Sequence, residues 1–251
     1  GNRKELGALD LATYEDGRVV LTGTSFRFDQ ESETGEATGA VLRFKGVPIL
    51  AGPTISFPLS DKRKSGVLPP TIGIYNVNGV ELTVPYYWNI APNRDATFFP
   101  TLMSKRGLDL AGEFRYLEAA YSGEVAGNFM PSDSLRNSDR WGFTSLHRGI
   151  VDTRIAGIGN VGLNLNLNRV SDDNYWKDFT RANGSLTQRL LANDATVSWS
   201  SGFYSASVRA LKWQTLQDVT SPIIPPYDRL PQVAGRYARS NVAGLDVSVA
   251  A

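Results

Sequence analysis

The sequence contains 251 residues, enough for one or two domains with a substantial buried core. Its 26 basic and 25 acidic side chains nearly balance, so charge gives no reason to expect nucleic acid as a partner. Cysteine is absent and His147 is the one histidine, which excludes disulfide frameworks, multi-histidine metal centres and a cysteine nucleophile from this stretch of chain. We therefore expect no metal and no cofactor.

The first 60 residues differ in pattern from the rest. Residues 8–14, 18–28 and 37–57 are expected to form strands, and the second face of these strands is mostly apolar. Such a pattern suggests a small jelly-roll or solenoid-like sheet. We expect residues 1–60 to form this domain and residues 61–251 to form the next one.

Beyond residue 61, apolar residues recur with a period of two, which is typical of half-exposed strands. Residues 161–168 give the clearest case, because valine and leucine occupy one face and three asparagines the other. The same alternation recurs at residues 80–88, 108–116, 195–199 and 245–249. Turns are expected at residues 76–79, 104–107 and 131–133. The chain stops within the last alternating run, and we expect it to be a fragment.

Alternation alone fits a soluble β-sandwich as well as an outer-membrane barrel. Two features favour the barrel. The polar face continues over the 9–11 residues or so that a tilted strand needs to cross a bilayer. Aromatic residues also gather near strand ends, as at residues 86–88 and at Trp141 and Phe143. No transmembrane helix is expected, and the polar stretch 171–183 is interpreted as a long loop.

No set of side chains predicts catalysis. His147 lacks the partners of a nucleophilic triad. Asp172 and Asp173 lack the spacing of glycosidase carboxylates or of a calcium loop, and we interpret them as solvated loop residues. The charged run 61–64 is interpreted as a solvated turn between domains. We expect no enzymatic activity.

Several sequence blocks resemble the LptD family of LPS-assembly outer-membrane proteins. The blocks occur in the order and near the spacing of that family. They are LRFKGVPIL at 42–50, ISFPLSDKRKSG at 55–66, VPYYWNIAPNRDAT at 84–97, MSKRG at 103–107 and GEFRYL at 112–117. A looser resemblance continues to residue 181 and includes RVSDDNYWKDF at 169–179.

The resemblance implies an all-β protein that transports lipopolysaccharide (LPS). Residues 1–60 would be the C-terminal part of a periplasmic jelly roll, and residues 61–251 the first antiparallel strands of a large transmembrane β-barrel in the cell outer membrane. The implied partners are LPS, the plug lipoprotein LptE, the periplasmic bridge protein LptA and outer-membrane lipid. Many members join their two domains by disulfides, so the family cysteines lie outside this chain or are lacking in this branch.

An apolar groove is needed to carry acyl chains through water, because each exposed methylene costs about 0.8 kcal/mol. The candidates for its lining are Val20, Phe26, Phe28, Leu42 and Phe44. The residues themselves fit the filling of a closed core equally well. The resemblance favours the groove.

Two prolines are candidates for a lateral gate in the barrel wall. Pro70 and Pro85 fall on the first two expected strands, and each lacks the N–H that would pair with a neighbouring strand. Both match prolines that are thought to loosen the gate in the family. The alternative is that each proline only begins a strand or lies at an edge.

The working hypothesis is a non-enzymatic LPS transporter. A passive porin-like channel and a secreted carbohydrate-active β-sandwich are the alternatives. LPS-independent conductance would support the first alternative, and solubility without detergent together with polysaccharide cleavage would support the second.

Overall fold

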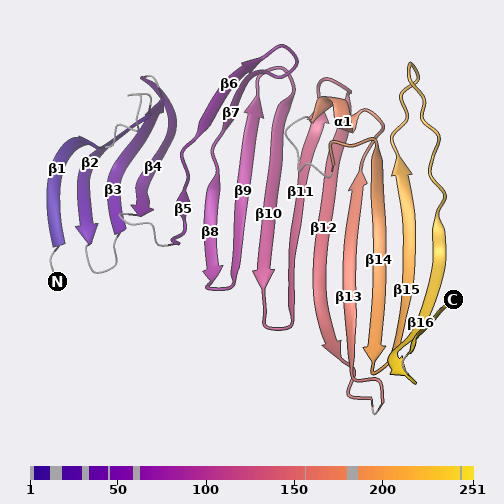
Figure 1. Ribbon diagram of the computed structural model, residues 1–251. Coiled ribbons are helices and arrows are strands. Elements are labelled where there is room, and N and C mark those ends of the chain that lie inside the picture. Colours follow the sequence, from indigo (N-terminus) through magenta and orange to yellow (C-terminus); the bar gives the residue numbers. More distant parts are fainter. Residues whose placement is uncertain are drawn as a thin grey trace. The chain divides into compact units, whose positions relative to one another are not determined.

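The computed structural model describes residues 3–11, 19–29, 34–44, 46–58, 63–155, 157–179, 186–243 and 245–251. Within these residues, seventeen strands and a single short helix are found (Figure 1). The expected all-β class is therefore confirmed. The strands belong to two sheets, one of four strands and one of thirteen.

The four-stranded sheet is an antiparallel meander in the order β1-β2-β3-β4. Its strands are β1 (Arg3–Leu11), β2 (Val19–Asp29), β3 (Thr34–Phe44) and β4 (Val47–Pro58). The stretch 37–57, expected to be extended, divides into β3 and β4 at Gly46. This residue has a φ of +80°, a conformation that glycine adopts without strain. The expected domain boundary falls at residues 59–62, which lie outside the described part of the chain.

The remaining strands form the larger sheet, and consecutive strands from β9 to β17 are neighbours in it. They are β5 (Gly66–Val67), β6 (Thr71–Tyr75), β7 (Gly79–Thr83), β8 (Tyr86–Ala91), β9 (Arg94–Met103), β10 (Gly107–Leu117), β11 (Tyr121–Asp133), β12 (Ser138–Asp152), β13 (Asn160–Val170), β14 (Leu190–Ser201), β15 (Tyr204–Thr215), β16 (Arg229–Val242) and β17 (Leu245–Ala250). The turns expected near residues 76 and 104 are confirmed, whereas the third turn follows Asp133 instead of ending there.

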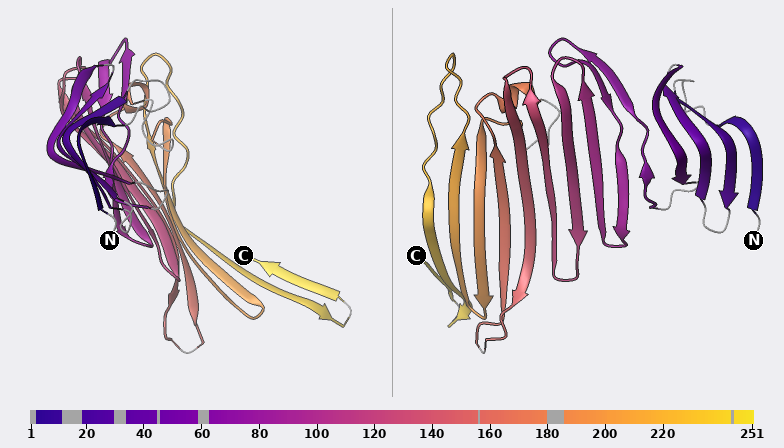
Figure 2. Two further views of the ribbon diagram at one scale, coloured as in Figure 1. Left: turned by 90° about the vertical axis from the view of Figure 1, so that its left-hand side faces the viewer. Right: turned by 180° about the vertical axis from the view of Figure 1, so that it is seen from behind.

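The chain divides into two compact units. The first contains residues 1–73 and 82–100, and the second contains residues 74–81 and 101–251. In the second unit, strands β11 to β15 lie side by side as long antiparallel ribbons (Figures 1 and 2). No other layer of strands packs on these five in the described part of this unit.

A short helix, α1 (Tyr175–Asp178), interrupts the stretch that we interpreted as a long loop. That interpretation was wrong for these four residues. Tyr175 and the following Phe179 are buried, and their rings stack with centroids 4.4 Å apart. Burial of these two rings stabilises a single helical turn. A helix this short has no repeating pattern in the sequence from which it could be predicted. None of the described helical residues forms a helix long and apolar enough to cross a membrane.

Candidate functional site

An apolar cluster lies on the four-stranded sheet of the first unit. Its buried members are Leu21, Phe26, Ala37 and Ala40, and the half-buried Phe28, Leu42, Ile55 and Phe57 pack against them. The Phe28 ring stands 6.5 Å from Phe26 and 6.3 Å from Phe57, measured between centroids. We call these eight residues the N-terminal apolar cluster. Four of its side chains remain partly open to contact.

A break in strand pairing brings this cluster together. Leu21 and Phe26 are five residues apart, so strict alternation would place their side chains on opposite faces of β2. Strands β2 and β3 pair from Val19 to Thr22 and again from Ser25 to Asp29. Opposite this gap, Gly39 has a φ of +56°, which interrupts the regular alternation of β3. Residues from both sides of the gap therefore contact one another.

The structure unites three of the five residues predicted to line the groove. Phe26, Phe28 and Leu42 belong to the N-terminal apolar cluster. Val20 is half-buried and precedes Leu21, so its side chain points to the opposite face of the strand. Phe44 ends β3, and its side chain lies outside the part that the structure describes.

Five further cluster members were not anticipated: Leu21, Ala37, Ala40, Ile55 and Phe57. Ile55 and Phe57 alternate on β4 and could have been identified from their spacing. Leu21 and Ala37 could not, because the break at Gly39 changes which residues share a face. Gly35 is also part of the arrangement, since a Cβ there would come within 2.4 Å of the Phe57 ring.

The two candidate gate prolines lie in matching gaps between short strands. Pro70 separates β5 from β6, and Pro85 separates β7 from β8. β5 pairs with β8, and β6 pairs with β7. In the gap, the Leu68 N–H donates to the Pro85 carbonyl at 2.8 Å, whereas neither proline has an N–H to donate. The residues were expected within strands and instead lie just outside them.

The chain segment before β5 is fastened to the hairpin formed by β8 and β9. The Arg63 guanidinium forms an ion pair with Asp95 and donates to the Tyr87 hydroxyl at 2.9 Å. The Arg63 carbonyl accepts from the Asn89 side chain at 2.8 Å, and Ser65 accepts from the Asn89 backbone at 2.9 Å. The Arg63 side chain remains 52% exposed, in agreement with the interpretation of this run as solvated, and it also fastens the segment to the hairpin.

One face of the second unit's strands is apolar and exposed. Cross-strand pairing places Leu110 opposite Phe129, and Phe129 opposite Trp141, at exposures of 49%, 45% and 38%. Val197 and Val208 form a similar exposed pair on β14 and β15. Large apolar side chains held in this way do not form a closed core. Exposed apolar area of this extent indicates contact with lipid or with another apolar surface.

The opposite face of the same strands is polar, except near α1, where Met130 and Val170 belong to a buried apolar cluster. Thr144 donates to the Asn168 side-chain oxygen at 2.9 Å, and the Asn168 amide donates to Asn166 at 2.8 Å. Asp194 and Arg209 form an ion pair on β14 and β15. Amide, hydroxyl and charged groups such as these also form hydrogen bonds with water. This face is therefore suited to an aqueous surrounding.

His147 lies on the apolar face, not in a catalytic set. Its Nδ1 is 2.6 Å from the Tyr116 hydroxyl. The imidazole also lies 5.8 Å from the Tyr116 ring and 6.0 Å from the Tyr121 ring, between centroids. Rings that combine an apolar body with polar atoms suit the boundary between lipid and water.

Known proteins resemble this chain over most of its length. The model of the family described as LPS transport system D (LptD) matches residues 138–251. The LPS-assembly protein LptD of Albidiferax ferrireducens is 65% identical over 234 residues, which cover 92% of this chain and 29% of that protein. The proteins of the same name from Polaromonas sp. and Paracidovorax citrulli are 62% and 57% identical over 87% and 96% of this chain. The chain spans less than a third of these relatives.

Adjacent alanine substitutions test the placement of the N-terminal apolar cluster. Leu21→Ala should lower the free energy of unfolding of the four-stranded sheet by about 2–4 kcal/mol, because it opens a cavity in the cluster. Val20→Ala should lower it by less than about 1 kcal/mol, because that side chain is only half-buried on the other face. Pulse proteolysis of the full-length protein in urea measures both values. Equal losses would contradict the assigned faces.

Proposed function

Since this chain belongs to the LptD family, we propose that it forms part of a protein that carries LPS to the outer membrane and inserts it into the outer leaflet. The proposed role is physical transfer without catalysis, in keeping with relatives that are named as assembly proteins. The observation that carries the proposal is the pair of faces on the second unit's strands, of which the apolar one is exposed.

We propose that the second unit's strands begin a transmembrane β-barrel in the outer membrane, with the apolar face towards lipid. Aromatic rows near the two ends of these strands support this assignment. The Phe129–Trp141 row and the Tyr121–Gly149 row are eight residues apart on β12. Eight residues span about 27 Å along a strand, or about 21 Å across a membrane at a tilt of about 40°. This distance is close to the apolar band of outer-membrane barrels, about 25 Å tall.

The four-stranded sheet is proposed to belong to a periplasmic jelly roll that conducts the acyl chains. An acyl chain needs continuous apolar contact, because each methylene left in water costs about 0.8 kcal/mol. The N-terminal apolar cluster offers Phe28, Leu42 and Phe57 as partly open side chains. We propose these residues as the contact surface, with the buried Phe26 beneath them.

The proline gaps are proposed as the weak part of a lateral gate. A saccharide in a polar interior and acyl chains in lipid can separate only where the barrel wall opens. Strands resist opening in proportion to the hydrogen bonds between them, and Pro70 and Pro85 each remove one donor. The segments β5–β6 and β7–β8 form a hairpin whose tip is the turn at 76–78, and we call it the first hairpin of the larger sheet. The position of the prolines in opposed gaps of this hairpin supports the role.

The partners follow from the same proposal. LPS would reach the first unit from a periplasmic bridge protein of the LptA type, and a plug lipoprotein of the LptE type would occupy the polar interior. The exposed, uncharged amide groups of Asn164 and Asn166 suit contact with sugar or with a polar protein surface.

Photo-crosslinking tests the acyl path. A photoreactive residue at Phe28 of the full-length protein should capture LPS in cells, and the adduct should vanish when the upstream ATP-driven supply is blocked. The same residue at Val20, on the other face of β2, is the matched control and should capture much less. Equal adducts at both positions, or none at Phe28, would rule out the proposed path.

Restoring the missing donors tests the gate. Pro70→Ala together with Pro85→Ala permits two further interstrand hydrogen bonds, each worth about 1 kcal/mol. Newly made LPS should therefore reach the cell surface several times more slowly, at an unchanged level of the protein. Pro53→Ala, on the exposed part of β4, is the control. Unchanged export in the double variant would remove the prolines from the gate.

A further inference from the structure

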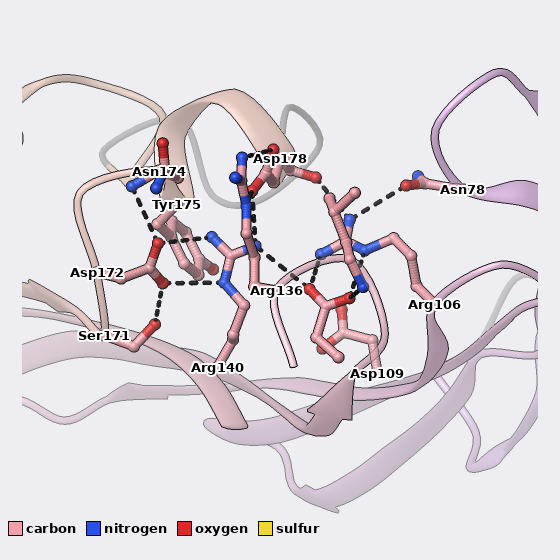
Figure 3. A network of polar contacts seen from close by, with 12 residues as sticks. Asn78, Arg106, Asp109, Arg136, Arg140, Ser171, Asp172, Asn174, Tyr175 and Asp178 are labelled. Carbon is pink, nitrogen blue, oxygen red and sulfur yellow. Dashed lines mark hydrogen bonds and ion pairs between the residues drawn. The ribbon is translucent and has the colours of Figure 1, made fainter. Parts of the chain in front are cut away.

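Two buried arginines join four connections at one end of the second unit's strands (Figure 3). The connections are the turns at 76–78, 104–106 and 134–137 and the segment 171–179. Residues 169–179 belong to a sequence block that carries the family resemblance without an evident role in lipid transfer.

Arg106 is the centre of this arrangement. Its side chain and that of Asp133 are both fully buried, and two hydrogen bonds of 3.1 and 2.6 Å connect them. Its Nη1 donates to the Asn78 side-chain oxygen at 3.1 Å and to the Asp178 carbonyl at 2.8 Å. One guanidinium therefore contacts the turn at 76–78, the end of β11 and the segment after β13.

Arg140 completes the ionic cluster. It forms ion pairs with Asp133 at 3.2 Å, with Asp178 at 2.7 Å and with Asp172 at 2.9 Å. The guanidiniums of Arg140 and Arg106 lie 4.9 and 4.5 Å from the centre of the Phe179 ring. Buried charges of this kind are stable when each has its partners, and the loss of one partner is strongly destabilising.

Asp172 is charged within this cluster. Burial by itself would raise the pKa of its carboxyl group, but hydrogen bonds from Arg140 and Ser171 outweigh burial and lower the pKa below its usual value. The interpretation of Asp172 as a solvated loop residue was therefore wrong. The cluster was not predicted, because its members come from separate connections.

The tip of the first hairpin rests directly on the turn that carries Arg106. The Ser104 N–H donates to the Val80 carbonyl at 2.9 Å, and the Val80 N–H donates to the Ser104 hydroxyl at 2.9 Å. The Lys105 N–H donates to the Asn78 carbonyl at 3.2 Å. Gly79, with a φ of +73°, permits this approach, since a Cβ there would lie 2.3 Å from the Ser104 hydroxyl oxygen.

The division of the chain into units follows the same hairpin. Residues 74–81, at the tip, belong with residues 101–251, whereas both arms of the hairpin beyond the tip belong with the first unit. Pro70 and Pro85 lie in those arms. The fixed contacts and the missing hydrogen-bond donors are therefore at different places along one hairpin.

We propose that Asn78 and Arg106 anchor the tip of the first hairpin to the buried ionic cluster, so that the hairpin bends at the proline gaps while its tip stays in place. The inference rests on the proposed lateral gate and names the residues that position it. Neither residue touches LPS in this account. They act by fixing one end of the moving hairpin.

Hydrogen–deuterium exchange of the full-length protein tests the anchor. Asn78→Ala removes the acceptor for Arg106 and should speed exchange of the amides at 79–81 and 104–106 by about tenfold. Asn76→Ala, in the same turn but with an exposed side chain, is the matched control and should leave exchange unchanged. Equal exchange in the two variants would overturn the anchor. Protection of β11 to β13 in both variants shows that each is folded.

A reversible disulfide tests the bend. Val80→Cys with Ser104→Cys locks the tip to the neighbouring turn under oxidising conditions. LPS export should continue at the rate of the reduced protein, because the tip does not move. Export that stops on oxidation and returns on reduction would overturn the proposed bend at the prolines. The Phe28 crosslinking experiment, done without the two cysteine substitutions, tests LPS transport itself. Absence of that adduct would count against transport but would not affect the hydrogen–deuterium exchange comparison of the Asn78 and Asn76 variants.

Discussion

The sheet of the second unit depends on one constraint, which is that its two faces require different surroundings. A strand exposes alternate side chains to opposite sides, so a period-two sequence creates an apolar face and a polar face at once. The exposed valine, leucine and aromatic side chains on one face are not satisfied by water. The asparagine, threonine and charged side chains on the other face are not satisfied by lipid. A sheet between lipid and water satisfies both faces.

The first unit handles apolar surface differently. Its four-stranded sheet gathers aromatic and aliphatic side chains into one cluster, half of whose members remain partly open. The break opposite Gly39 brings Leu21 and Phe26 into the same cluster. In the sequence, this cluster is followed by Arg63, which is held by Asp95, and by the proline gaps. Along the chain, the N-terminal apolar cluster is thus followed by the segment fastened through Arg63 and then by the strands whose pairing the prolines weaken.

Much of the fold could be predicted because alternation is a local property. The strands with leucine at every second position were found by spacing alone, as were the turns at 76–79 and 104–107. Phe26, Phe28 and Leu42 were found because they are apolar and neighbouring. The placement of Val20 on the face opposite Leu21 could not be predicted, because the pairing breaks opposite a glycine whose φ no sequence pattern reveals.

The ionic cluster could not be predicted, since its residues meet only after the strands have paired. Arg106 lies in the turn between β9 and β10, Asp133 ends β11, and Asp178 ends a helix of one turn. Each residue alone is an ordinary charge near a turn. A buried arginine whose three guanidinium nitrogens all have hydrogen-bond partners emerges only from tertiary structure.

The most direct test of the central claim is the solvent on each face of β13. Spin labels at Leu163, Asn164, Leu165 and Asn166 of the full-length protein, reconstituted in lipid, report collisions with oxygen and with a water-soluble nickel complex. The account predicts that labels at the two leucine positions collide mainly with oxygen and labels at the two asparagine positions mainly with nickel. Leucine positions that neither reagent reaches would contradict it, because the apolar face would then be buried in protein.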